Sequence, residues 1–211
     1  MNIYLVFINL NMLLIIIGID LCRHAPIKIR IFAKVCFFWM LLRQISLIIM
    51  LVKKNIEYLY LLRYLTFVDI IVIPLLACMV VYILARNNKI NFYKYYLIGF
   101  ILSVLYVLGV IKFDYMVSLT KNYGYLISIK NNNLIIIFQL VVYTIILFSS
   151  LLLLVKTNNI NRCIILLIIA CCVSIVEALI YSTYIYMIPN YLISNCIWLI
   201  LTDCVLSKFS R

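Results

Sequence analysis

Charged residues, glycine and histidine are all scarce in this 211-residue chain. Charged side chains make up 11% of it, and it has four glycines and a single histidine, His24. One histidine excludes a metal site built from several histidines, and so few glycines leave no Walker-type phosphate loop. The HExxH and GxSxG motifs and a helical pair of metal-binding aspartates are also missing. We therefore expect no enzymatic activity, no cofactor and no metal site.

Apolar residues take the place of these groups. They make up 68% of the chain, and the mean hydropathy of +1.22 lies far outside the range of soluble domains. A helix needs about 20 mostly apolar residues to cross a bilayer. Seven stretches meet or approach that length: 3–21, 31–51, 61–84, 95–111, 134–155, 163–186 and 189–206. Because the apolar runs do not alternate with polar residues as barrel strands do, we expect 1–211 to be one all-α transmembrane domain, a multi-pass bundle.

The distribution of lysine and arginine predicts the orientation, because basic residues near span ends are retained on the cytoplasmic side. With the N-terminus outside and the C-terminus inside, more of them lie on the cytoplasmic side than outside. The cytoplasmic set is Arg23, Lys28, Arg30, Lys34, Arg86, Lys89, Lys94, Lys156, Arg162, Lys208 and Arg211, and the outer set is Lys53, Lys54, Arg63, Lys112, Lys121 and Lys130. The net charge of +12 is scattered in this way, so we expect contact with the lipid bilayer and no nucleic-acid partner.

Three ionisable residues lie deep in the predicted spans: Arg43, Asp69 and Glu177. Each costs roughly 2.5–3.5 kcal/mol at a helix centre, so such groups face the bundle interior and pair with one another. Their positions in the spans place them at comparable depth. Two interpretations stay open, a ligand or switch site and a structural ion pair that fixes helix register. Pro74, in the middle of the third span, predicts a kink there and makes this helix the best candidate for a moving part.

The longest connection, 112–133, falls on the predicted outer face. We expect no regular element in it, and structureless loops of this length are often functional. Tyr115, Tyr123 and Tyr125 would form either an aromatic lid over a ligand or part of the aromatic belt at the lipid headgroups.

Several short motifs in the first three spans carry a resemblance to a known family. They are Arg23-His24-Ala25-Pro26, Phe32, Phe38-Trp39-Met40-Leu41, Tyr64-Leu65, Pro74 and Val81-Tyr82, and Tyr123-Gly124-Tyr125 is compatible with them. Together they resemble the N-terminal seven-transmembrane sensor region of bacterial histidine kinases. The Thr-Asn and His pair of that family is missing after the fourth span, and no phosphoacceptor histidine or ATP-binding domain follows. The resemblance therefore implies a sensor region that stands alone or works with a separate partner.

Our leading hypothesis is a receptor-like protein of a bacterial cell membrane that binds a small or peptide ligand in its outer half. A cytoplasmic signalling partner, a kinase or a regulator, would detect the change, and the sequence is also compatible with a homodimer. The high content of Ile, Asn, Lys and Tyr is typical of an AT-rich genome. A second hypothesis is the substrate-binding membrane subunit of a small-solute uptake transporter, which has a similar size, although no sustained small-residue stripe for docking is present. A peptide-pheromone receptor is a third.

Overall fold

The computed structural model describes residues 2–52, 61–85, 92–120, 124–130, 133–156, 162–182 and 189–209. Within these ranges seven helical segments are long and apolar enough to cross a membrane. The elements are α1 (Asn2–Leu21), η1 (Cys22–His24), α2 (Ile27–Val52), α4 (Arg63–Thr66), α5 (Asp69–Ala85), α6 (Tyr93–Lys112), β1 (Tyr115–Thr120), β2 (Gly124–Ile129), α7 (Asn133–Lys156), α8 (Arg162–Ser182), α9 (Leu192–Leu206) and η2 (Ser207–Phe209). The predicted bundle of about seven candidate membrane helices is confirmed.

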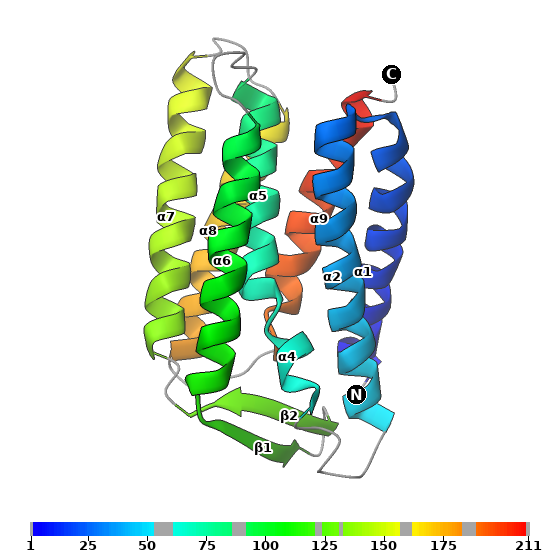
Figure 1. The fold of residues 1–211 in the computed structure, drawn as a ribbon, viewed down its shortest axis with the longest axis vertical. Coiled ribbons are helices and arrows are strands. Elements are labelled where there is room, and N and C mark those ends of the chain that lie inside the picture. Colours follow the sequence, from blue (N-terminus) through cyan, green and yellow to red (C-terminus); the bar gives the residue numbers. More distant parts are fainter. Residues whose placement is uncertain are drawn as a thin grey trace.

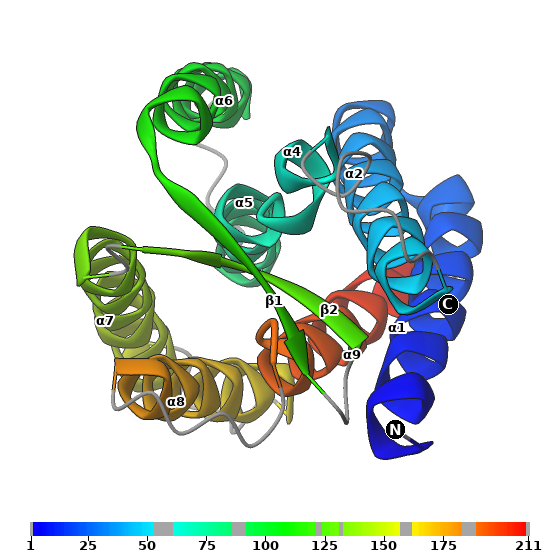
Figure 2. The same ribbon diagram turned by 90° about the horizontal axis from the view of Figure 1, so that it is seen from below.

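The long helices run side by side along one axis, and α5 and α9 occupy the middle (Figures 1 and 2). Helix α5 contacts α2, α6, α7 and α9, and α9 packs against α1 and α8 as well. Helix α6 lies at the periphery in the end-on view of Figure 2. Large apolar side chains of the outer helices, such as Phe100 and Phe148, are exposed. A surface of this kind is expected where a bundle faces lipid chains rather than water.

A two-stranded antiparallel hairpin, β1 and β2, connects α6 to α7. Its register pairs Tyr115 with Ile129 and Thr120 with Gly124. Our expectation of a connection without regular structure is therefore wrong. The cause is local, since β1 and β2 are rich in β-branched, aromatic and leucine side chains that suit a pleated surface, and Gly124 takes a φ of +74° without steric cost.

The hairpin crosses one end of the bundle, the end at which the chain begins (Figures 1 and 2). The C-terminal residues lie at the opposite end (Figure 1). A chain that crosses a membrane an odd number of times has its two termini on opposite sides, which fits the seven candidate spans of the described residues. The hairpin is thus placed to cover the helix ends beneath it.

The third span is interrupted at Phe67 and Val68, between α4 and α5, while Pro74 lies buried inside α5. Phe67 has φ −101° and ψ 11°, outside the helical region. The carbonyl oxygen of Thr66, at the end of α4, accepts a hydrogen bond from the side chain of Arg43 instead of a backbone amide. The break therefore has a side-chain partner from α2. It lies six to seven residues before Pro74, where the sequence predicts a kink.

Candidate functional site

A buried ion pair links α2 to α5. The Nη2 atom of Arg43 lies 2.9 Å from Oδ2 of Asp69, and the two side chains are 1% and 5% exposed. Arg43 also donates from Nε to the carbonyl oxygen of Thr66 at 3.1 Å and from Nη2 to the carbonyl oxygen of Asn190. One guanidinium thus joins α2, the α4–α5 break and the segment before α9. Charge-assisted hydrogen bonds of this kind are about twice as strong as neutral ones.

The segment that begins α9 completes this polar cluster. Asn195 donates from Nδ2 to Asp69 at 3.4 Å, and the side-chain amide of Asn190 donates to the hydroxyl of Tyr4 at 3.0 Å. The backbone N–H of Asn190 donates to the hydroxyl of Tyr181. We name the group Arg43, Thr66, Asp69, Asn190 and Asn195 the polar centre. It ties together helices that begin and end far apart in the sequence.

Backbone strain accompanies the start of α9. Asn190 has φ 67° and Tyr191 has φ 50°, both in the left-handed region. Asparagine tolerates this region, whereas a left-handed tyrosine costs about 1–2 kcal/mol. The Tyr191 ring stacks on Tyr181 with centroids 4.4 Å apart, which helps to hold it. Such strain persists only where the surroundings fix it, and it is common at ligand sites and switches.

Glu177 of α8 does not join Arg43. Among the described residues it forms no salt bridge, and its Oε2 atom accepts a hydrogen bond from the backbone N–H of Ser194 at 2.9 Å. Ser194 is the third residue of α9, where helix N–H groups have no partner within the helix and the helix dipole favours an anion. Glu177 therefore stabilises the start of α9, while Asp69 alone pairs with Arg43.

The three loop tyrosines have different positions. Tyr115 of β1 lines a cavity under the hairpin, and the guanidinium carbon of Arg63 lies 5.4 Å from the centre of its ring. Tyr125 of β2 does not line that cavity, although both Tyr115 and Tyr125 pack against the apolar cluster around Leu47 and Met50. Tyr123 lies outside the described residues. Burial raises the pKa of the Tyr115 phenol to about 12, although the nearby Arg63 cation acts in the opposite direction.

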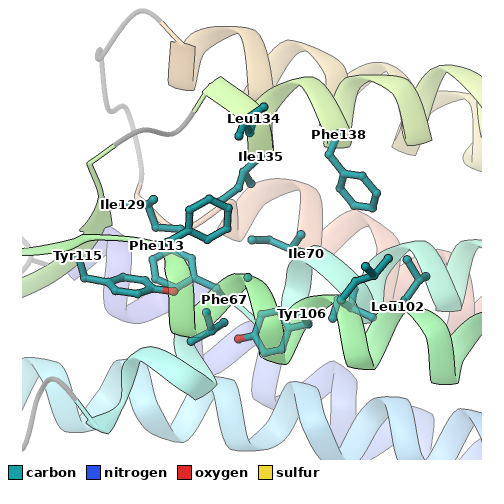
Figure 3. A pocket seen from close by; sticks show the side chains of 14 residues that line it. Phe67, Ile70, Leu102, Tyr106, Phe113, Tyr115, Ile129, Leu134, Ile135 and Phe138 are labelled. Atoms are coloured by element: carbon teal, nitrogen blue, oxygen red, sulfur yellow. The ribbon is translucent and has the colours of Figure 1, made fainter.

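A cavity of about 210 Å³ lies between the hairpin and α5, α6 and α7. Figure 3 shows side chains of all these elements converging on it, and most are apolar or aromatic. A smaller cavity of about 20 Å³ adjoins it and is lined by Arg43, Asp69 and Asn190 of the polar centre. Phe67, Ile70, Ile129 and Ile135 line both cavities. A third cavity, of about 550 Å³, lies between α2, α5 and α6, with exposed side chains such as Val35 and Phe100 in its wall.

The sequence located Arg43 and Asp69, but only the structure shows what they do together. Thr66 and Asn190 bind Arg43 through backbone oxygens, which no residue type reveals in advance. Asn195 could have been found from its place as a polar residue in an apolar span. Among the described residues no group of three His, Cys, Asp or Glu side chains could hold a metal ion.

Comparison with protein-family models, with curated proteins and with solved structures finds no significant match. The resemblance to the sensor region of histidine kinases stays a prediction from the residues quoted above. The functional argument therefore depends on the site itself.

Proposed function

We propose that this chain is a membrane-embedded sensor that binds a small ligand under the hairpin and signals to a cytoplasmic partner. One observation carries the proposal: a buried, charged polar centre at a helix break adjoins an apolar cavity under the hairpin. The two spaces share the side chains of Phe67 and Ile70, which stand at the break itself. A ligand in the cavity would contact the same residues that position Asp69.

Signalling would involve two alternative arrangements of the residues at the break between α4 and α5. A ligand that displaces Phe67 or Ile70 favours the packing in which Asp69 and Thr66 sit differently against Arg43. Because Arg43 also holds the segment before α9 through Asn190, the shift would pass to α9, which runs to the other end of the bundle. A ligand changes such an equilibrium only by its difference in affinity for the two packings.

The orientation belongs to this proposal. The basic residues favour an outside N-terminus, and the chain begins at the hairpin end of the bundle (Figure 1). The ligand cavity would then lie in the outer half of a bacterial cell membrane. The C-terminal end, where η2 carries Lys208, would face the partner in the cytoplasm.

Substitution of Asp69 in the polar centre, and of Glu177, which holds the start of α9 beside it, tests the sensor. We expect Asp69→Asn and Glu177→Gln to change the transcript profile of cells that carry them, compared with wild-type cells at equal amounts of protein in the membrane. Asp20→Asn is a matched control, because its side chain is 68% exposed at the end of α1. Profiles of the two variants identical to that of the wild type would contradict the proposal. An adjacent gene for a kinase core or a response regulator would support it.

A second candidate, the binding subunit of an uptake transporter, is favoured by the large cavity between α2, α5 and α6. Its exposed rim would let a substrate or a transport partner approach from the side. Uptake of a labelled solute that depends on this protein would favour the transporter. An adjacent gene for an ATPase and a coupling subunit would do the same.

A further inference from the structure

A residue in the wall of the small cavity has a buried donor without an acceptor. Arg43 is 1% exposed, and its Nη1 atom has no hydrogen-bond partner among the residues that the structure describes. Arg43 itself forms part of the cavity wall. A buried polar group without a partner costs free energy of folding, and the cost is greater when the group is charged. An acceptor atom that enters this cavity would recover that free energy.

The volumes limit what can fit. The small cavity of about 20 Å³ has room for one water molecule or one terminal oxygen atom. The adjoining cavity of about 210 Å³ is larger than the 150 Å³ cavity that accepts benzene, so it holds about eight non-hydrogen atoms. Its lining is apolar, and the few polar atoms in it belong to Tyr106, Tyr115 and the backbone. The two spaces together fit an apolar body with one oxygen at its end.

The charges near the small cavity favour a neutral oxygen. Arg43 is already paired with Asp69, so the pair carries no net charge. A carboxylate or phosphate head would add a buried negative charge that no free cation balances among the described residues that line the small cavity, whereas a carbonyl oxygen accepts a hydrogen bond without bringing charge.

We propose that the occupant is a neutral apolar molecule of about nine non-hydrogen atoms whose carbonyl oxygen accepts a hydrogen bond from Nη1 of Arg43. The apolar body fills the cavity under the hairpin. Such a molecule dissolves in the bilayer and reaches the cavity from the side, through the space between α2, α5 and α6, which shares Ile71 and Tyr106 with it. This inference rests on the proposed sensor, because it names the chemical class of its ligand.

Binding to the purified chain in lipid nanodiscs tests the class. The probe is tritiated 2-octanone, with uptake by empty nanodiscs subtracted. We expect saturable binding that unlabelled 2-octanone displaces. The hydrocarbon 2-methyloctane, in which a methyl group replaces the carbonyl oxygen, should displace it about tenfold less well, the factor that one hydrogen bond of about 1.4 kcal/mol gives. Octanoate should also displace it less well, because it brings a negative charge into a buried site. Equal displacement by either compound would overturn the proposal.

Two tryptophan variants of α7 locate the site. Ile135 lines both cavities, so Ile135→Trp should fill the space and abolish saturable binding. Ile137→Trp is the matched control, because Ile137 is 56% exposed on the same helix and lines neither cavity. In Arg43→Lys the advantage of 2-octanone over 2-methyloctane should disappear. Unchanged binding by the Ile135 variant would place the probe elsewhere and overturn the inference.

The cell experiment tests the sensor and the binding experiment tests the ligand class, so each proposal can be overturned without the other. Saturable ketone binding with transcript profiles unaffected by Asp69→Asn would overturn the sensor and keep the ligand class. An altered profile with no saturable binding of 2-octanone would overturn the ligand class and keep the sensor.

Discussion

Gly18 of α1 lies so close to Phe37 of α2 that a Cβ atom at position 18 would stand 2.4 Å from Cζ of Phe37. The same Cβ atom would lie 2.6 Å from Oδ1 of Asp203 in α9. Phe37 is fully buried, so its ring has no free space into which it can move. The missing side chain at position 18 therefore sets the distance between three helices, as small residues commonly do in membrane bundles.

Gly18→Ala should lower the free energy of unfolding by about 1–3 kcal/mol, the usual cost of overpacking, although alanine is the better helix former. Gly99→Ala is the matched control, because a Cβ atom there would meet Leu75 and Phe32 only at 3.6–3.8 Å. We expect that variant to be as stable as the wild type or more so. Unfolding of both in mixed micelles with increasing dodecyl sulfate measures the difference. Equal stability of the two variants would show that α1 can move away at no cost.

Ser174 should contribute to stability through Trp198. The indole Nε1 of Trp198 donates to Oγ of Ser174 at 2.8 Å, and both side chains are buried between α8 and α9. Ser174→Ala leaves that N–H without a partner and should cost about 1–3 kcal/mol. Ser103→Ala, which removes an exposed hydroxyl bonded to Gly99 of its own helix, is the control. If both substitutions lower the unfolding free energy equally, the indole bond contributes nothing specific.

The spans could be predicted because length and hydropathy alone decide whether a helix can cross a bilayer. The depth of Arg43 and Asp69 followed from the same count. The number of residues from the end of a span gives depth but not the rotation of the helix about its axis. For this reason Glu177 was grouped with Arg43, although it accepts a hydrogen bond from the first turn of α9. The partners of Arg43 at Thr66 and Asn190 are backbone oxygens, which every residue has.

The hairpin was missed although its signal was present. Residues 115–120 and 124–129 are rich in Val, Ile, Tyr and Leu, and Gly124, the first residue of β2, has a positive φ that suits glycine. Span length and hydropathy do not distinguish a strand from a loop between two membrane helices. The break before Asp69 has no signal in the sequence. The apolar run continues through Phe67 and Val68, and the interruption depends on contacts with α2.

The Arg43–Asp69 pair predicts a characteristic pattern in a double-mutant cycle. Asp69→Leu leaves the guanidinium buried without its carboxylate and should cost about 3–5 kcal/mol, as should Arg43→Leu for the converse reason. The double variant leaves no uncompensated charge, so we expect it to be more stable than either single variant. Heat-induced loss of the folded form in detergent measures all four proteins. A double variant that loses the sum of the single effects would show that Arg43 and Asp69 stabilise the fold independently.

Tyr115 predicts a dependence of stability on alkaline pH. Its pKa is raised from the ordinary value of 10.0 to about 12, chiefly because burial disfavours the phenolate. Below pH 10 the phenol is protonated in both the folded and the unfolded chain, so its contribution to stability is fully present there. As the pH rises through 12, the unfolded chain has released the proton that the folded chain still binds, and this contribution is lost.

We therefore expect the free energy of unfolding to fall between about pH 10 and pH 12, and to fall less steeply in Tyr115→Phe. The control is Tyr93→Phe, since the side chain of Tyr93 is 75% exposed. Unfolding curves at a series of pH values give the slopes for the three proteins. If Tyr115→Phe retains the slope of the wild type, the hairpin does not shield this phenol from water.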